Sequence, residues 1–500
     1  MFMEQVFNPF LPLYEYVADG EPHVFDGRVY IYGSHDAAFG TKYCEGHYVT
    51  WSAPADNLRD WRYEGVIYRR NQDPSNQDDK MQLWAPDVTK GPDGRYYLYY
   101  CFNFYSEIGV AVSDTPAGPF EFYGHVQYPK EVLEGEGVQG DMMPFDPAVL
   151  TDDDNRVYLY YGFAPACEKE MLLPEFSEAD LQAMPEDERK KIEGMMNAKM
   201  GENGMVVELE QDMLTMKGVP QVCVPGGHHT KGTGFEGHGF FEAPSIRKIN
   251  GRYYYVYSSH KSHELCYAVS ENPMEGYVYG GVIVSNGDIG YHGRTKPANT
   301  LGNNHGGIVK AGEDYYIFYH RQTHGTEFSR QDCAEKIQIL SDGSIPQVEI
   351  TSCGLNGGAL PASGSYPAAI ACHMTCPETL DHIDYQDSSM QVQTRMVQRQ
   401  NVQFLTDIHN HTVLGYKYFE CIGVCKITLE LRGHFNGTVK VAADEDGKEY
   451  FVEKTLSVQT KNWRMVELEG SILDGVHSLF LLFEGEGMLD MKSLSFENTL

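Results

Sequence analysis

One segment type recurs five times along this chain of 500 residues, and it constrains the fold more than any other feature. Each copy is a run of β-branched and aromatic residues behind a turn signal, which is typical of a strand leaving a hairpin. The copies read GRVYIYGS, GRYYLYYC, NRVYLYYG, GRYYYVYS and EDYYIFYH, beginning at residues 27, 94, 155, 251 and 313. Short strands repeated at about 60 residues predict the blades of a β-propeller. A β-sandwich with chance internal similarity is the alternative.

The repeats and the composition between them predict an all-β chain of two domains. Residues 1–350 hold the five repeats and are expected to form a five-bladed β-propeller, with a helical insertion at about 168–199, where the sequence is polar and favours helix. Residues 351–370 are rich in Gly, Ser and Pro, which predicts a linker. Alternating strand patterns in residues 371–500 predict a separate β-sandwich of the jelly-roll type.

The charge of the chain limits its partners. Lys and Arg total 39 against 71 Asp and Glu, so the formal net charge is −32. Such a surface repels nucleic acid and anionic membranes, whereas a neutral sugar is not penalised. The N-terminus MFMEQVFNPFLPLYEY lacks the pattern of a signal peptide, no run of about 18 apolar residues occurs, and the 11 Cys are scattered. These features favour a cytoplasmic protein whose thiols are reduced. The sequence does not indicate the oligomeric state.

Ionisable residues recur at one position of the repeat. Asp19, Asp146, Glu242 and His305 each lie eight or nine residues before the turn of their unit, and Trp84 to Asp87 hold the matching place in the second unit. The first strand of a propeller blade runs beside the central channel, so these residues should meet at one mouth. Converging carboxylates raise one another's pKa, which lets one stay protonated beside an ionised neighbour. Glycoside hydrolysis needs that division of labour, although any one of these residues alone could cap a turn.

Residues from about 7 to 350 resemble glycoside hydrolase family 43, the five-bladed propeller arabinofuranosidases and xylosidases. The resemblance rests on NPFLP and VADGEP within 8–22, FDPAVLTDDDNRVYLYYG at 145–162 and FFEAPSIRKINGRYYYVYSS at 240–259. It implies that Asp19 is the general base, that Asp146 orients the acid and raises its pKa, and that Glu242 is the general acid. Gly20 departs from the resemblance, because the family usually has Pro after the base.

The resemblance implies an inverting, exo-acting hydrolase that releases arabinose or xylose from short plant-cell-wall oligosaccharides. Inversion places the two carboxyl groups roughly 6.5–9.5 Å apart, whereas about 5 Å would indicate retention. The alternatives are a glycosidase for another sugar such as a β-galactoside, a phosphorylase on the same scaffold, and a sugar-binding propeller without catalysis. The invertase and fructosyltransferase clan is disfavoured, since Phe145 precedes Asp146 and Ala243 follows Glu242 where that clan has Arg and Cys.

The remaining candidate residues concern metal and substrate. NNHGGIVK at 303–310 resembles the segment whose histidine lies in the channel beside calcium or a water cluster, so the resemblance implies calcium at His305 and no organic cofactor. WAPDV at 84–88 resembles the border of the substrate pocket, which makes Trp84 and Asp87 candidates for sugar binding; Trp84 could equally pack between blades. Arg321 and Arg330 follow the fifth strand, and each could reach a sugar hydroxyl or cover the channel.

The C-terminal part, residues 371–500, resembles family 6 carbohydrate-binding modules, with the best match in GVHSLFLLFEGEGMLDMKSLSFE at 475–497. Trp463 is its only tryptophan, and it matches a position that is generally structural in such modules. An exposed tryptophan platform for sugar is therefore not expected. A packing domain that shapes the catalytic mouth is favoured over a sugar-binding module.

Overall fold

The computed structural model describes residues 7–103, 107–129, 144–165, 178–186, 189, 201–379, 393–400 and 402–499. Within these residues the regular structure is almost entirely β-strand. The α-helix found there is α2 (Glu178–Ala183), which lies inside the predicted insertion; most of residues 168–199 fall outside the described part. Short 3-10 turns are η1 (Pro74–Asn76), η3 (Gly227–His229), η4 (Tyr291–Gly293), η5 (Gly354–Asn356) and η6 (Ala368–Ile370). No helix of the described residues is long and apolar enough to cross a membrane.

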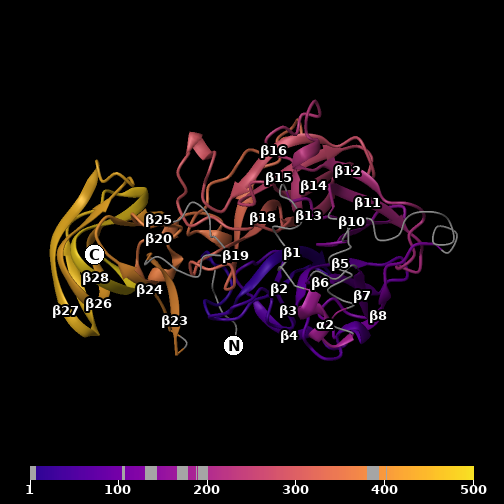
Figure 1. Ribbon diagram of the computed structural model, residues 1–500. Coiled ribbons are helices and arrows are strands. Elements are labelled where there is room, and N and C mark those ends of the chain that lie inside the picture. Colours follow the sequence, from indigo (N-terminus) through magenta and orange to yellow (C-terminus); the bar gives the residue numbers. More distant parts are fainter. Residues whose placement is uncertain are drawn as a thin grey trace.

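Five antiparallel sheets follow one another along the first two thirds of the chain and form the predicted five-bladed propeller (Figure 1). Each sheet uses consecutive strands, four in the first four blades and three in the fifth. Blades one and two contain β1 (Val17–Phe25), β2 (Arg28–His35), β3 (Tyr48–Pro54), β4 (Arg62–Tyr68), β5 (Leu83–Lys90), β6 (Tyr96–Phe102), β7 (Ile108–Ser113) and β8 (Glu121–His125). Blades three to five contain β9 (Ala148–Thr151), β10 (Val157–Tyr161), β11 (Asn203–Leu209), β12 (Gln221–Pro225), β13 (Phe240–Ile249), β14 (Arg252–Ser259), β15 (Glu264–Ser270), β16 (Val278–Ser285), β17 (Ile308–Ala311), β18 (Asp314–Arg321) and β19 (Gln331–Ile337).

The repeated aromatic segment is the second strand of every blade, and its two faces pack against the two neighbouring blades. In β10, for example, Val157, Leu159 and Tyr161 pack toward the second blade, while Tyr158 and Tyr160 pack toward the fourth. Because both faces are buried between blades, the strand reads as a continuous apolar run instead of an alternating one. Five separate cores, one at each seam, therefore account for the five copies of the segment.

The ring closes through the N-terminal segment. Asn8 lies against the outer edge of β19: its Nδ2 donates to the Ala334 carbonyl at 3.1 Å, and the Ala334 amide donates to Asn8 Oδ1 at 2.9 Å. The Asn8 amide also donates to the Ser352 carbonyl at 3.0 Å. The start of the propeller is thus held to its end by hydrogen bonds, and Asp19 enters the first blade from a fixed point.

The innermost strands of four blades share a backbone kink beside the channel. Positive φ values occur at Asp19 (56°), Ala85 (24°), Asp146 (49°) and Ala243 (62°). Three of these coincide with breaks in the strand pairing, between Ala18 and Glu21, between Trp84 and Asp87, and between Glu242 and Ser245. Such bulges re-aim side chains and recur near active sites. Here they turn the ends of β1, β5 and β13 toward the axis.

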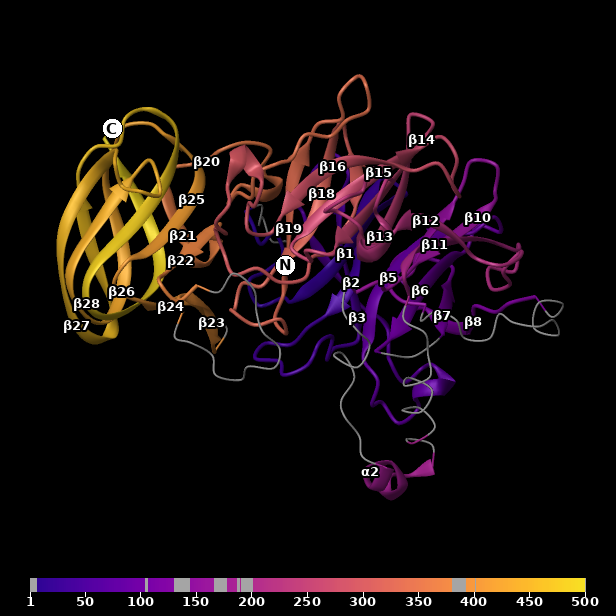
Figure 2. The same cartoon turned by 45° about the horizontal axis from the view of Figure 1, so that its top comes forward.

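The C-terminal residues form a sheet of nine strands packed around a single apolar core. Its strands are β20 (Leu360–Pro361), β21 (Gly364–Pro367), β22 (His373–Thr375), β23 (Arg395–Arg399), β24 (Val402–Ile408), β25 (Thr412–Cys421), β26 (Val424–Ala442), β27 (Tyr450–Glu469) and β28 (Gly475–Asn498). β20 and β21 lie in the stretch predicted as a linker, and they pair with β25 and β28. The C-terminal domain lies at one side of the propeller in both views (Figures 1 and 2).

Candidate active site

Asp19 is a buried carboxylate at the start of β1, 5% exposed, with two cationic or polar partners. Arg330 Nη1 donates to Asp19 Oδ1 at 2.9 Å, and His320 Nδ1 lies 3.2 Å from the same oxygen. Burial alone would raise the pKa of Asp19, but the charge of Arg330 and the contacts with His320 outweigh it and hold the pKa well below its usual range. Asp19 is therefore ionised at neutral pH, as a general base must be.

His320 contacts the backbone of Asp19 as well as its side chain. The Asp19 amide donates to His320 Nδ1 at 3.1 Å, and His320 Nε2 lies 2.8 Å from the Asn303 carbonyl. His320 Nδ1 thus faces both the amide and the carboxylate of Asp19, whereas Nε2 faces Asn303. Burial lowers the pKa of His320, consistent with the neutral form.

Arg330 is shared between two carboxylates. Its Nε and Nη2 donate to Asp36 Oδ2 and Oδ1 at 2.9 and 3.1 Å, while Nη1 reaches Asp19. The guanidinium also lies over the Tyr43 ring, 4.9 Å from its centroid. Its side chain is 2% exposed. Arg330 therefore holds Asp19, and its Nε, Nη1 and Nη2 are all engaged by carboxylates.

The pKa values of Asp146 and Glu242 are both raised, whereas that of Asp19 is lowered. Burial raises the pKa of Glu242 to about 8, with the charge of Asp19 adding to the effect. Burial, Glu242 and Asp19 likewise raise the pKa of Asp146. Asp146 Oδ2 accepts a hydrogen bond of 3.1 Å from the Ala243 amide, which directly links Asp146 to the strand that carries Glu242. Glu242 is half-buried, so its carboxyl is placed to keep a proton and still meet a ligand.

Trp84 belongs to a continuous row of aromatic rings around the mouth. Successive centroid distances are 5.0 Å for Phe328–Tyr43, 5.7 Å for Tyr43–Trp84, 5.3 Å for Trp84–Phe145, 4.9 Å for Phe145–Phe163 and 5.5 Å for Phe163–Phe241. Phe145 and Phe241 immediately precede Asp146 and Glu242. Apolar surface beside the carboxylates supplies the burial that raises their pKa values. Trp84 itself is half-buried and can offer a partial face to a sugar ring.

Asp87, in the innermost strand of the second blade, is fully buried. Its Oδ1 lies 2.6 Å from His23 Nε2, and its Oδ2 accepts from the Val149 amide at 2.7 Å. The carboxylate thus joins blades one, two and three. Both oxygens are engaged, which favours a structural role for Asp87 over contact with a sugar.

His305 lies between the carboxyl groups of Asp146 and Glu21. Its Nδ1 is 3.8 Å from Asp146 Oδ2, and its Nε2 is 3.9 Å from Glu21 Oε1. Burial lowers the pKa of His305 to about 4, so the ring is neutral at pH 7. His305 Nε2 and Glu21 Oε1 are both buried and without a hydrogen-bond partner among the described residues. Both atoms therefore retain hydrogen-bonding capacity.

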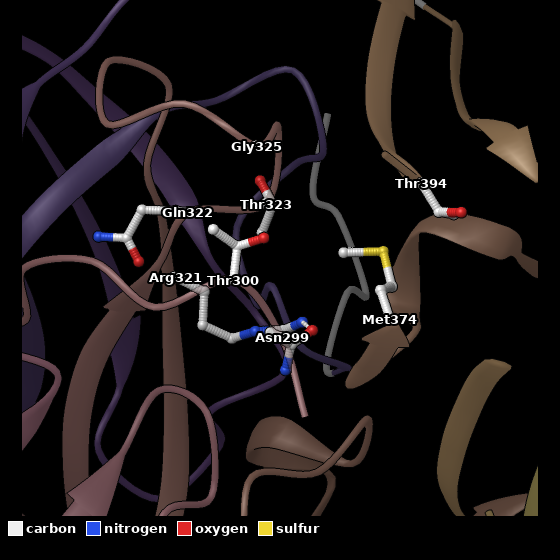
Figure 3. A pocket seen from close by; sticks show the side chains of 8 residues that line it. All are labelled: Asn299, Thr300, Arg321, Gln322, Thr323, Gly325, Met374 and Thr394. Atoms are coloured by element: carbon white, nitrogen blue, oxygen red, sulfur yellow. Dashed lines mark hydrogen bonds between the residues drawn. The ribbon is translucent and has the colours of Figure 1, made fainter. Parts of the chain in front are cut away.

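Arg321 points away from the catalytic group. Its Nη2 donates to Asn299 Oδ1 at 2.9 Å and to the Ala371 carbonyl at 3.1 Å, and its side chain is 2% exposed. It lines a pocket between the propeller and the C-terminal domain, shown in Figure 3 together with Met374 and Thr394 from the other side. Of the predicted residues, Asp19, Asp146, Glu242, His305 and Arg330 come together at the axis, whereas Arg321 lies at the domain seam.

Sequence reasoning missed several residues of this centre. Glu327 is a buried carboxylate, 1% exposed; its Oε2 accepts from the Tyr43 hydroxyl at 3.3 Å, and its charge adds to the rise in the Glu242 pKa caused by burial and by Asp19. With its amide nitrogen toward Glu327, Asn303 lies 3.1 Å from Glu327 Oε2 and 3.3 Å from Arg330 Nη1. These residues lie outside the repeat register, so no periodic signal identifies them. The clustering of polar residues in HRQTHGTEFSRQ was the one available hint.

The class of this protein follows from its fold and its site: it is a glycoside hydrolase. At the axis of a five-bladed propeller, one carboxylate is ionised, a second carboxyl group keeps its proton, and aromatic rings form an apolar rim. The model of Glycosyl hydrolases family 43 matches residues 22–203 and 194–345. The chain belongs to that family.

The relatives include one of nearly equal length. The chain is 45% identical to a xylosidase/arabinosidase of Thermoclostridium stercorarium, over 98% of this chain and 99% of the relative. It is 26% identical to an arabinoxylan arabinofuranohydrolase of Paenibacillus polymyxa, over 97% of this chain and 73% of that protein.

Solved structures show the same architecture. A family 43 arabinoxylan arabinofuranohydrolase from Bacillus subtilis, in complex with cellotetraose, aligns with 98% of this chain and 97% of its own, at a TM-score of 0.50 and 21% identity. At that identity the likeness concerns the fold, and it extends over both domains. A GH43_1 enzyme from Xanthomonas citri aligns with 69% of this chain and 94% of its own, at a TM-score of 0.50 and 25% identity.

Proposed function

We propose that this protein is an inverting, exo-acting glycosidase that releases arabinose or xylose from short arabinoxylan- or xylan-derived oligosaccharides. The observation that carries the reaction is the opposed protonation of Asp19 and Glu242 at one mouth. The sugar is inferred from relatives described as xylosidase/arabinosidase and as arabinoxylan arabinofuranohydrolase. A neutral oligosaccharide also agrees with the net charge of −32, which disfavours anionic substrates.

The base in this proposal is Asp19. Its charge is held by Arg330 and its backbone by His320, so its carboxylate can take a proton from a water without moving. That water attacks the anomeric carbon from the face opposite to the leaving group, and the configuration inverts. We expect the two reacting carboxyl groups to lie roughly 6.5–9.5 Å apart, which leaves room for the water.

The acid in this proposal is Glu242. A pKa of about 8 keeps it protonated at neutral pH, and its partial exposure lets it donate the proton to the departing glycosidic oxygen. Asp146 holds the Ala243 amide next to the acid, which fixes the orientation of Glu242. The row of aromatic rings from Phe328 to Phe241 excludes water from the acid and offers its half-buried faces to the sugar.

A divalent cation fits the axis only with water as its main ligand. Among the described residues, Glu21 Oε1 and His305 Nε2 are buried ligand atoms without hydrogen-bond partners, 3.9 Å apart. Glu21 Oε2 is already bound to Arg247 Nη2 at 2.7 Å, so a positive charge is present beside it. Calcium takes six to eight oxygen ligands. We infer that calcium, when bound, would be held by Glu21 and His305 with water completing the shell, and would supply positive charge beneath the carboxylates.

The proposal is tested by turnover. The full-length protein is assayed on nitrophenyl α-L-arabinofuranoside, β-D-xyloside and β-D-galactoside and on arabinoxylan-derived and xylo-oligosaccharides, beside the variant Glu242→Ala. We expect one pentoside to be hydrolysed, with kcat/KM on the oligosaccharides falling about 10²–10⁴-fold in the variant, because general acid catalysis is lost. Glu236→Ala is the matched control, since Glu236 is exposed on the preceding loop and binds the Gly232 amide.

Stereochemistry tests the mechanism separately. Proton NMR of the first product should show an anomer opposite to that of the substrate. A product of unchanged configuration would contradict single-step inversion. No turnover of any substrate by the folded wild-type protein would favour a propeller that binds sugar without cleaving it.

A further inference from the structure

The loop that joins β18 to β19, residues 322–330, connects the two residues that hold Asp19. His320 precedes it at the end of β18, and Arg330 closes it before β19. The loop is also held from the propeller side, because Thr323 Oγ1 donates to Gln331 Oε1 at 2.7 Å. A shift of this loop would therefore act directly on Arg330 and, through the end of β18, on the neighbouring His320.

This loop presses against the C-terminal domain. The Met396 amide in β23 donates to the Thr323 carbonyl at 3.0 Å. At Gly325, where φ is +65°, a Cβ atom would lie 2.9 Å from Gln393 Nε2, so the loop backbone directly abuts the other domain. Figure 3 shows Thr323 and Gly325 on the propeller side of this seam and Met374 and Thr394 across from them.

The segment that leads into Asp19 contacts β23 as well, and also the next strand, β24. The Tyr16 hydroxyl donates to Gln398 Oε1 in β23 at 2.6 Å and accepts from Gln403 Nε2 in β24 at 3.1 Å. The same hydroxyl lies 3.3 Å from His324 Nε2 in the loop. Tyr16 is 3% exposed, and burial raises its pKa to about 12, so the hydroxyl keeps its proton. Three elements therefore converge on one hydroxyl group.

We propose that β23 and β24 of the C-terminal domain are a positioning element for the general base. They hold the Tyr16 segment and the 322–330 loop in one arrangement, and thereby hold Asp19 against His320 and Arg330. The C-terminal domain serves catalysis through these contacts and not through a sugar site of its own. The proposal rests on the role of Asp19 in the proposed function.

The chemistry of the C-terminal domain supports this role. Trp463, its one tryptophan, is covered by the guanidinium of Arg432 at 4.3 Å from the ring centroid and by the Phe404 ring at 5.4 Å. A ring whose face is occupied by a cation offers little surface for stacking on a sugar. The contacts with the propeller, by contrast, are buried and specific. An error of about 1 Å in the placement of a catalytic group can cost about 10²-fold in rate. Contacts between the domains that fix the position of Asp19 can therefore change the rate substantially.

The decisive pair of variants is Gln398→Leu and Gln398→Glu. Leu removes the acceptor for the Tyr16 hydroxyl at similar size, whereas Glu retains an acceptor oxygen. We expect kcat to fall about 10-fold in Gln398→Leu with KM little changed. The acidic limb of kcat/KM should move to higher pH, because Asp19 loses part of its contact with Arg330 and its pKa rises. Gln398→Glu should restore most of kcat, and Gln459→Leu, at an exposed site on β27, should resemble wild type.

Hydrogen–deuterium exchange gives a second readout that needs no activity. Exchange at residues 322–330 and 14–19 should rise in Gln398→Leu and stay unchanged in Gln459→Leu. A Gln398→Leu protein with lowered melting temperature but unchanged exchange in these segments and an unchanged acidic limb would overturn the proposal. If the wild-type protein hydrolyses nothing, the proposed function fails, and the exchange result alone decides whether the two strands hold the loop.

Discussion

Asp19 and Glu242 carry the same functional group and differ through their neighbours. Asp19 is placed against a guanidinium and an imidazole, whereas Glu242 is placed against aromatic rings and other carboxylates. The first environment favours the charged form and the second the neutral form. The division between base and acid is thus decided by contacts within a few ångströms of each carboxyl group.

The basic limb of the pH profile reports Glu242. We expect kcat/KM of the wild-type protein to fall as the pH rises through about 8, because the acid loses its proton there. The profile of kcat/KM on an oligosaccharide substrate, measured from pH 4 to pH 10, checks this. A basic limb near the ordinary glutamate value of about 4.3 would contradict it.

Glu327 adds negative charge near the acid, and its removal has a defined direction. In Glu327→Gln the pKa of Glu242 should fall, so the basic limb should move to lower pH. Glu327→Asp keeps the charge and serves as the control. An unmoved basic limb in Glu327→Gln would mean that burial and the other carboxylates account for the raised pKa.

The kinked inner strands show how an element accommodates a site. At Gly20, directly after the base, a Cβ atom would lie 2.1 Å from Asp332 Oδ2. Asp332 is 2% exposed, and neither of its oxygens has a hydrogen-bond partner among the described residues. The Asp332 carboxyl thus fills the space that a side chain at residue 20 would need. This explains why Gly stands here where the family resemblance suggests Pro.

Gly20→Ala should therefore destabilise the protein. Adding Asp332→Ala should reduce that loss of stability, because it removes the carboxyl group that clashes with the new Cβ atom. We expect Gly20→Ala to cost about 1–3 kcal/mol of unfolding free energy, as overpacking does. The double variant Gly20→Ala/Asp332→Ala should recover most of that loss, giving a positive coupling in a double-mutant cycle. Gly218→Ala, where no atom lies within 4 Å of the added Cβ, is the control. Additive losses measured by urea unfolding would show that the clash is absorbed elsewhere.

On the scale of the whole molecule, the two domains are joined by buried charge. Lys417 Nζ lies 2.8 Å from Glu349 Oε1 and 3.2 Å from Asp288 Oδ2, and the Lys417 side chain is 4% exposed. Burial raises the pKa of Asp288 to about 6, and the charge of Lys417 opposes that rise. Arg294 and Glu445 form a further ion pair between the domains. Ion pairs therefore join the two domains in addition to the hydrogen bonds made by β23 and β24.

Lys417→Met should weaken the docking of the domains more as the pH rises. The variant leaves the buried Asp288 carboxyl group and the half-buried Glu349 carboxyl group without their cation, which costs about 3–5 kcal/mol once they are ionised. Because the folded-state pKa of Asp288 lies above its unfolded value, stability is lost as the pH rises through it. The drop in melting temperature should thus be larger at pH 7.5 than at pH 5. Lys217→Met, which breaks a surface pair with Glu208 at 2.7 Å, should cost less than about 1 kcal/mol at either pH.

Much of this architecture was readable along the chain. Each aromatic segment, such as GRYYLYYC, is a strand because of its own residues and turn, and five copies predict five blades. The register of Asp19, Asp146, Glu242 and His305 predicted their convergence, because every first strand starts at the same mouth. The position of each side chain within a repeat is a short-range property, and the sequence carries it directly.

The partners of these groups were decided only by the tertiary structure. Arg330 and Arg321 lie nine residues apart and read alike, yet one holds Asp19 and the other crosses to the Ala371 carbonyl. Asp87 shares the repeat position, but its carboxylate oxygens contact His23 Nε2 and accept a hydrogen bond from the Val149 amide. Tyr16 meets Gln398 from almost 400 residues away. The amino-acid sequence determined the repeated strands and the carboxylates that they carry. The packing of distant segments decided which carboxylate keeps its charge, because pKa values depend on contacts that no local pattern encodes.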